Sequence, residues 1–247
     1  MSYYGSELLH KVFRKNGQRS RYMHIADINT KIVLYSSLAL ICIGTIGIAL
    51  FEWNGAFASF SVGEKIVQSL FNAVAPRTAG FNSVALSDFS RVTIILYLVL
   101  MWIGGGSQST AGGIKVNTFV VALASLKSLI KGEHSTTLFN REITYSSIRR
   151  ALVVVFGSIC IIALFYVALL LLEPNIPSID LLFESVSAFS TVGSSLGITP
   201  LLGDISKVLL VVLMFLGRVG FITVLMSILP QNEQPKYRLP KEDIIIN

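Results

Sequence analysis

Two short loops carry residues suited to coordinating a cation. The segments APRTAGFNS (75–83) and SAFSTVGSS (187–195) each contain Thr-x-Gly, at Thr78 to Gly80 and at Thr191 to Gly193. Glycine adopts positive φ without steric cost and lets backbone carbonyls approach a ligand, while threonine adds a hydroxyl oxygen. Carbonyls on such a loop can replace the water around an ion. A single Thr-x-Gly is usually an ordinary turn, so the weight of the argument rests on its repetition.

The repetition extends beyond the two loops. An offset of 113 residues superposes Thr-x-Gly on Thr-x-Gly, and it also superposes LMWIG (100–104) on LMFLG (213–217). Upstream, LFNAV (70–74) matches LFESV (182–186) with a slip of one residue. Self-similarity at a fixed offset indicates a repeated structural unit. We expect each unit to contain a spanning helix, a short helix, the glycine-containing loop and a second span.

The composition predicts an integral membrane protein. Of the 247 residues, 53% are hydrophobic and 14% are charged, and the mean hydropathy is +0.68. Because about 20 apolar residues cross ~30 Å of hydrocarbon, spans are predicted at 31–51, 151–172, 205–229 and, with an interruption, 92–129. The short helices, predicted at 64–75 and 179–189, are too brief to cross and favour re-entrant segments. The predicted fold class is therefore an all-α membrane protein with two tandem helix–pore-helix–helix repeats.

The charge distribution predicts the topology. Segments 1–31, 127–150 and 230–247 hold six, five and three basic residues, whereas the segments between spans on the opposite side hold four: Lys65, Arg77, Arg91 and Lys207. The positive-inside rule places both termini and the central loop in the cytoplasm. The opposite side carries seven acidic residues against those four bases. This excess would concentrate cations at an external mouth, although a solvated acidic loop explains it equally.

A glycine-rich stretch interrupts the span at 92–129. It comprises Gly104, Gly105, Gly106, Ser107, Gln108, Ser109, Thr110, Ala111, Gly112, Gly113, Ile114 and Lys115. Each glycine costs a helix ~1 kcal/mol relative to alanine, so the helix is expected to break here. A phosphate-binding loop is rejected because no strand precedes the stretch. A kink or a site of close helix packing is the structural alternative to a loop at membrane depth.

Arg218 is expected to lie deep within the last span. It stands 14 residues after Asp204 and 11 before Leu229, and a charge at such depth costs ~2.5–3.5 kcal/mol on insertion scales. A structural ion pair or a carbonyl contact would account for it. In the repeat alignment Arg218 corresponds to Gly105, so we expect the arginine and the glycine-rich stretch to lie at equivalent depths.

These motifs resemble the membrane subunits of the Trk, Ktr and HKT potassium transporters, whose pore has four helix–pore-helix–helix repeats. APRTAGFNS and SAFSTVGSSLGIT resemble loops of the third and fourth repeats, GSQSTAGGIK resembles the intramembrane gating loop, and YRLPKEDIII resembles the cytoplasmic tail. The resemblance implies a gate at 104–115 and an electrostatic barrier at Arg218. It also implies that half of a potassium selectivity filter is formed by Thr78, Ala79, Gly80, Phe81, Thr191, Val192, Gly193 and Ser194.

The resemblance further implies a bacterial plasma-membrane protein that conducts K⁺, or Na⁺, without enzymatic chemistry. It would work with a cytosolic nucleotide-binding ring, and the chain itself would bind no cofactor, no transition metal and no nucleic acid.

Two repeats are half of the family's four. The chain is therefore expected to be a truncated reading frame, one part of a split transporter, or half of a homodimer. The alternative function is a non-conducting fragment or regulatory subunit that assembles with a missing half. A secondary transporter is disfavoured because its repeats would be inverted.

The expected organisation has five parts. They are a basic cytoplasmic segment (1–30), a first pore repeat (31–130) with a re-entrant loop at 63–83 and the gate at 104–115, a cytoplasmic connector (131–150), a second pore repeat (151–229) with a re-entrant loop at 177–198, and a cytoplasmic tail (230–247).

Overall fold

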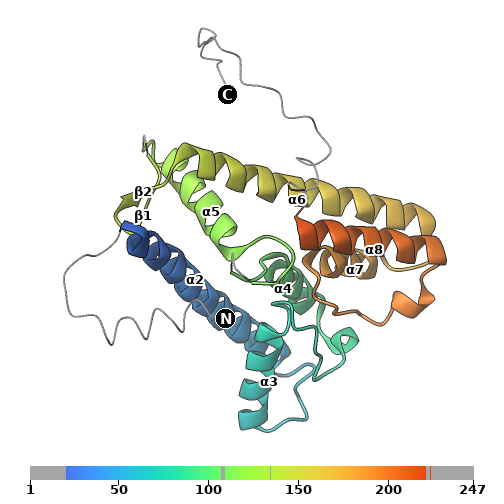
Figure 1. The fold of residues 1–247 in the computed structure, drawn as a ribbon. Helices are drawn as coiled ribbons and strands as arrows, with labels where there is room; N and C mark the ends of the chain where they lie inside the picture. The colour runs from blue at the N-terminus through green and yellow to red at the C-terminus, as the bar shows by residue number, and fades with distance from the viewer. Residues whose placement is uncertain (1–20, 107–108, 134, 221–222, 224–247) are drawn as a thin grey trace, which may run out of the picture.

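The computed structural model describes residues 21–106, 109–133, 135–220 and 223, with side chains from residue 28 onward. This part of the chain is mostly helical (Figure 1). Its helices are α2 (Arg21–Glu52), α3 (Val62–Val74), α4 (Arg91–Trp102), α5 (Val116–Ile130), α6 (Tyr145–Leu172), α7 (Ser178–Ser190) and α8 (Asp204–Val219). Two single-turn 3₁₀ helices, Leu86–Asp88 and Thr199–Leu201, precede α4 and α8.

In the part of the chain that the structure describes, two helices are long and apolar enough to cross a membrane, Ile28–Glu52 within α2 and Tyr145–Leu172. Much of their apolar surface is exposed in this chain, as expected where lipid or another helix covers it. The first part of the predicted last span (205–229) is helix α8. This helix ends at Val219 because Gly220 takes a φ of 84°. The rest of that prediction, apart from residue 223, lies outside the described residues.

The two short helices lie where the sequence predicts them, within two residues at each end. At 13 residues each is about 20 Å long, too short for a crossing. Ser61 caps α3 through a capping box, in which Glu64 accepts a hydrogen bond from the Ser61 backbone N–H at 2.8 Å. Pro177 immediately precedes α7, where its missing N–H costs nothing.

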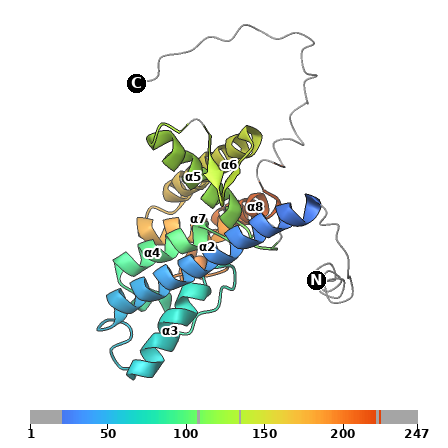
Figure 2. The same cartoon turned by 90° about the vertical axis from the view of Figure 1, so that its left-hand side faces the viewer.

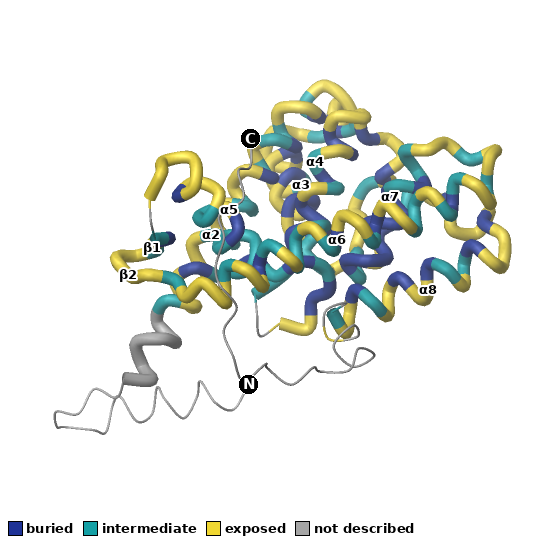
Figure 3. Tube along the Cα trace, turned by 90° about the horizontal axis from the view of Figure 1, so that it is seen from above, coloured by how far each residue is buried: buried dark blue, intermediate teal, exposed yellow. Residues whose placement is uncertain are grey.

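Helix α7 is largely buried and lies next to α8 (Figure 1). It packs against α4, α6 and α8, and every residue from Phe183 to Ser190 is buried. Helix α4 also contacts α2, so α4 and α7 join the two halves of the chain, an arrangement that Figure 2 shows from the side. Buried residues therefore gather around α7, whereas the outer faces of α6 and α8 are largely exposed (Figure 3).

Helix α3 has an inverted amphipathic pattern. It buries Lys65, Ser69 and Asn72, while Val67 and Leu70 are 65% and 47% exposed. A helix in water would bury the apolar face instead. The exposed apolar face of α3 therefore suits a membrane environment or a further helix.

In each half of the chain, a glutamate at the end of the helix before the short helix caps the start of the helix after it. Glu52, at the end of α2, accepts hydrogen bonds from the Ser90 N–H (2.9 Å) and the Thr93 hydroxyl (2.5 Å) at the start of α4. Glu173, just after α6, accepts from the Gly203 N–H (2.7 Å) and the Ser206 hydroxyl (2.7 Å) at the start of α8. Each glutamate thus satisfies an N–H and a hydroxyl at a helix N-terminus, where negative charge is favourable.

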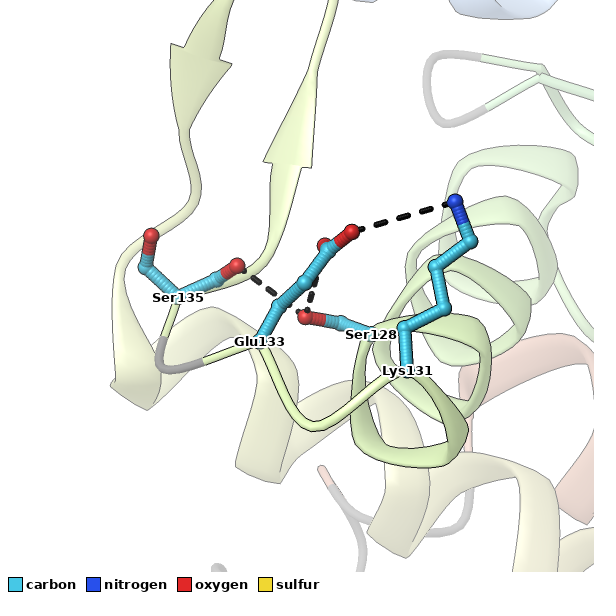
Figure 4. A network of polar contacts seen from close by, with 4 residues as sticks. All are labelled: Ser128, Lys131, Glu133 and Ser135. Atoms are coloured by element: carbon cyan, nitrogen blue, oxygen red, sulfur yellow. Dashed lines mark hydrogen bonds and ion pairs between the residues drawn. The ribbon is translucent and has the colours of Figure 1, made fainter.

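A small β-hairpin within 131–150 departs from the all-α prediction. Strands β1 (Thr137–Leu138) and β2 (Arg141–Glu142) pair antiparallel around Phe139 and Asn140, whose φ values are 50° and 59°. Positive φ at both central residues produces the two-residue turn that hairpins favour. The hairpin follows the end of α5, where the Ser128 hydroxyl bonds Glu133 and the Ser135 carbonyl, and Lys131 pairs with Glu133 (Figure 4).

Candidate functional site

Both Thr-x-Gly loops adopt a backbone conformation that proteins rarely use. The φ values are 71° at Thr78 and 68° at Gly80 in the first loop, and 51° at Thr191 and 86° at Gly193 in the second. A β-branched residue at positive φ is strained by about 1–3 kcal/mol and is held there only by its surroundings. Such strain concentrates at functional sites. Ala79 and Val192, between each pair, do not share the positive φ.

The two loops touch each other. A Cβ placed on Gly80 would overlap the carbonyl oxygen of Val192, and it would lie 3.5 Å from the Gly193 carbonyl carbon. Any larger residue at position 80 would therefore displace the second loop. A Cβ on Gly193 would meet nothing within 4 Å, so this glycine borders open space. The structure thus brings together two loops that lie 113 residues apart in the sequence.

The outer residues of the loops occupy different environments. Ala79 and Phe81 are exposed, and Phe81 is 70% exposed. Ser194 is buried, and its carbonyl accepts a hydrogen bond from the Ser187 hydroxyl of α7 at 2.6 Å. The Ser194 carbonyl is therefore engaged with α7.

The glycine-rich stretch leaves the helical conformation between α4 and α5. Gly104 donates its N–H to the Ile114 carbonyl (2.8 Å), and Ile114 donates to the Trp102 carbonyl (3.2 Å). The two ends of the stretch therefore lie side by side. Ser107 and Gln108 lie outside the described residues; Ser109 and Thr110 are exposed, and Ala111 is buried.

This stretch reaches the second Thr-x-Gly loop directly. The backbone N–H of Gly112 donates to the Thr191 hydroxyl at 3.1 Å. A Cβ on Gly112 would overlap that hydroxyl, and one on Gly113 would lie 3.1 Å from the Ser190 hydroxyl. Glycine is therefore required for the stretch to approach the end of α7 this closely.

Two cations lie at the end of the stretch. Lys115 donates hydrogen bonds to the carbonyls of Ser109 (3.0 Å) and Ala111. Its ammonium group therefore holds the end of the stretch against its middle. Arg218, exposed in the last turn of α8, is near enough for its positive charge to repel that of Lys115. The arginine therefore lies close to the glycine-rich stretch. Behind it, Gly217 contacts α7 so closely that a Cβ would overlap the Phe189 carbonyl oxygen.

Arg77 was not identified as a site residue from the sequence, which placed it among the outer bases. In the structure it is half-buried, and its guanidinium donates to the Ser37 carbonyl and hydroxyl on α2 and to the Gly104 carbonyl, each at 3.2 Å. It thereby ties the residue before Thr78 to the start of the glycine-rich stretch. Its position next to a filter-like threonine in an apolar region is the signal that could have found it.

Some of the charges that the sequence assigns to an external mouth lie inside the protein. Glu52 and Glu184 are only 1% and 6% exposed, so their charges are directed into the protein. Two of the four bases are also engaged inside the protein. Arg77 bonds Ser37 and Gly104, and Lys65 is buried, donates to the Trp53 carbonyl at 2.7 Å and lies over the Trp53 ring. Counting charges along the sequence cannot distinguish these groups from solvated ones.

The structure is that of a largely helical chain, with two long apolar helices and two strained Thr-x-Gly loops in contact with each other. A family model described as a cation transport protein, TrkH, matches residues 20–238. The chain therefore belongs to the TrkH family of cation transport proteins. This is a family of multi-pass membrane transporters, which confirms the expectation that the chain is not an enzyme.

Several known proteins are similar to this chain over most of its length. The Ktr system potassium uptake protein B of Bacillus subtilis is 37% identical over 92% of this chain and 51% of its own length. The potassium/sodium uptake protein NtpJ of Enterococcus hirae is 34% identical over 89% and 50%, respectively. The crystal structure of the potassium transporter TrkH from Vibrio parahaemolyticus superposes with a TM-score of 0.64 at 21% identity, covering 82% of this chain and 44% of that one. The chain spans about half the length of the relatives it matches.

Proposed function

We propose that the chain forms part of the pore of a potassium uptake system and conducts K⁺, with Na⁺ as the competing ion. It would do so with two tandem helix–pore-helix–helix repeats, in which α3 and α7 are the pore helices. The names of the relatives support potassium as the ion, and the name of the Enterococcus protein adds sodium. The observation that carries the proposal is the meeting of two strained Thr-x-Gly loops beside open space at Gly193.

The proposed filter consists of Thr78–Phe81 and Thr191–Ser194. Positive φ at the first and third residues of each loop turns the peptide planes so that neighbouring carbonyls can face one side, as ion coordination by carbonyls requires. The engaged carbonyl of Ser194 makes Thr191, Val192 and Gly193 the main contributors from the second loop.

The proposed gate is the stretch 104–115, which lies against the second filter loop. Because Gly112 of the stretch donates a hydrogen bond to Thr191, a movement of the stretch would shift the second filter loop. Arg218 would add an electrostatic barrier beside it, because a fixed positive charge on the ion path repels cations. The closeness of Arg218 to Lys115 supports this placement.

The pore would be completed by another half, because two filter loops surround an ion less fully than a closed ring of loops does. That half is either a further polypeptide segment or a second copy of this chain. If neither assembles, the chain is a non-conducting half or a regulatory subunit. The span of about half of each relative and the uncovered apolar face of α3 support the need for additional helices.

The remaining expectations extend this proposal. The chain would lie in a bacterial plasma membrane with both termini in the cytoplasm. A cytosolic nucleotide-binding ring would regulate it through the connector at 131–150, where the hairpin projects, and through the tail at 230–247.

Rubidium uptake tests the proposal. Bacteria lacking their own potassium uptake would express the chain alone, or joined to the segment of the Bacillus relative that the chain does not match, with membrane insertion verified. The proposal predicts saturable uptake in at least one setting and its loss in Gly193→Asp, which places a carboxylate beside the filter. Absence of uptake in both settings, despite insertion, would contradict it.

A further inference from the structure

A buried carboxylate lies behind the second filter loop. Glu184 of α7 is 6% exposed. Its Oε1 atom accepts hydrogen bonds from the Ser195 hydroxyl and from the Thr199 hydroxyl, the latter at 2.8 Å. The Ser195 hydroxyl in turn accepts the N–H of Gly197 at 2.9 Å. The segment that follows Gly193 is therefore fastened to the pore helix at one atom of Glu184.

The carboxylate depends on these hydroxyl groups. Within the described ranges, no lysine or arginine lies within 4.0 Å of Glu184 to form a salt bridge. Asp180, one turn earlier on α7, is also acidic, and its negative charge repels that of Glu184. Because an unpaired buried carboxylate is costly, the two hydroxyl donors and Glu184 are held together strongly.

An equivalent contact lies behind the first filter loop. Asn72 of α3 donates through Nδ2 to the Ser83 hydroxyl at 3.2 Å, and Ser83 donates to the Gln68 side chain at 2.5 Å. Asn72 and Glu184 occupy the same position of the LFNAV and LFESV segments, and each bonds a serine eleven residues downstream. The two halves therefore share a tie from pore helix to filter loop, neutral in the first and carboxylate-based in the second.

We propose that Glu184 and Asn72 are positioning residues that hold the outer ends of the two filter loops and so set ion discrimination. This inference rests on the proposed function. Discrimination between K⁺ and Na⁺ depends on the number and placement of the coordinating carbonyls. A loop released from its tie can close around the smaller ion. Glu184 holds more of its loop than Asn72 does, because two hydroxyls converge on it.

Hydrogen exchange in lipid nanodiscs tests the ties without any transport assay. In Glu184→Ala the amides of 193–199 should exchange about tenfold faster, because a loop without its hydrogen bonds opens more readily, while those of 79–84 should not change. Asn72→Ala should give the reciprocal pattern. Glu184→Gln keeps an acceptor oxygen and should protect the loop, whereas Asp180→Asn, the matched control, should leave both loops unchanged.

The selectivity of uptake tests the consequence. The ratio of rubidium to sodium uptake should fall about tenfold in Glu184→Ala and be restored largely in Glu184→Gln, at equal surface expression. A merely structural role would lower both fluxes and leave their ratio unchanged, which would overturn the proposal. Unchanged exchange at 193–199 in Glu184→Ala would also overturn it. If the parent chain takes up no rubidium in either setting, the proposed function fails, and the exchange experiment still decides whether Glu184 holds the loop.

Discussion

The backbone N–H of Gly112 donates a hydrogen bond to the hydroxyl of Thr191 at 3.1 Å. Through this bond the glycine-rich stretch between α4 and α5 contacts the strained threonine of the second loop. A residue of the proposed gate and a residue of the proposed filter thus stabilise each other, although 79 positions separate them.

Thr191→Val should uncouple the proposed gate from the filter. Valine has the same shape but accepts no hydrogen bond, so the Gly112 N–H loses its partner at a cost of about 1 kcal/mol. We expect faster hydrogen exchange of the backbone amides at 109–113. We also expect residual rubidium uptake when the gate is closed. Thr45→Val is the control, because that hydroxyl bonds within its own helix, to the Ile41 carbonyl. Equal behaviour of the two variants would refute the coupling.

Arg77→Gln should loosen the first loop and the start of the gate together. The guanidinium donates to Ser37 and Gly104, and hydrogen bonds to a charged group contribute about 1.5–3 kcal/mol. We expect a lower midpoint of thermal unfolding in nanodiscs and reduced uptake. Arg77→Lys should not restore either property, because lysine lacks the planar fork. Arg91→Gln, at an exposed position at the start of α4, should change neither. A lysine variant as stable as the parent would contradict this account.

Gly217→Ala should destabilise the contact between α8 and α7. The added Cβ overlaps the Phe189 carbonyl oxygen, and overpacking costs about 1–3 kcal/mol. Gly63→Ala on α3 provides the control, because its Cβ would meet nothing within 4 Å and alanine favours a helix by about 0.5–1 kcal/mol. The thermal midpoints should therefore shift in opposite directions. An unchanged thermal midpoint in Gly217→Ala would show that α7 and α8 are further apart than the structure places them.

Glu173→Gln should lower stability at neutral pH and lose its effect in acid. The Gly203 N–H and then the Ser206 hydroxyl hold the pKa of Glu173 below its usual value. A lowered pKa in the folded state adds stability above the unfolded-state pKa, and this stability is lost as the pH falls through the folded-state value. Thermal unfolding from pH 7 to strong acid measures it, with the exposed Glu142→Gln as control. A difference independent of pH would mean that the carboxylate charge is not involved.

Arg218→Gln should raise rubidium uptake through a complete pore, because the substitution removes a fixed positive charge beside the ion path. Surface expression must be equal for the comparison. Lys115→Gln provides a contrast: Lys115 also holds the carbonyls of Ser109 and Ala111, so its loss should disorder the stretch as well. Unchanged uptake in Arg218→Gln would argue against a barrier.

The elements set by local sequence were predictable, whereas the contacts that assemble the site were not. Flanking glycine and proline and a short apolar run located α3 and α7 within two residues. The hydrogen bonds of Arg77 to Ser37 and of Glu52 to Ser90 span 40 and 38 positions. Hydropathy and charge counts carry no information on which polar groups meet at such separations. The hairpin was missed because its turn places Phe139, an unusual residue for positive φ, beside Asn140.

The most direct test of the central claim is the position of the ion. Crystals of the conducting assembly soaked in rubidium would be measured at the rubidium absorption edge. The account predicts an anomalous peak in contact with carbonyl oxygens of both Thr78–Gly80 and Thr191–Gly193. Peaks found only away from these loops, in a protein that takes up rubidium, would contradict it.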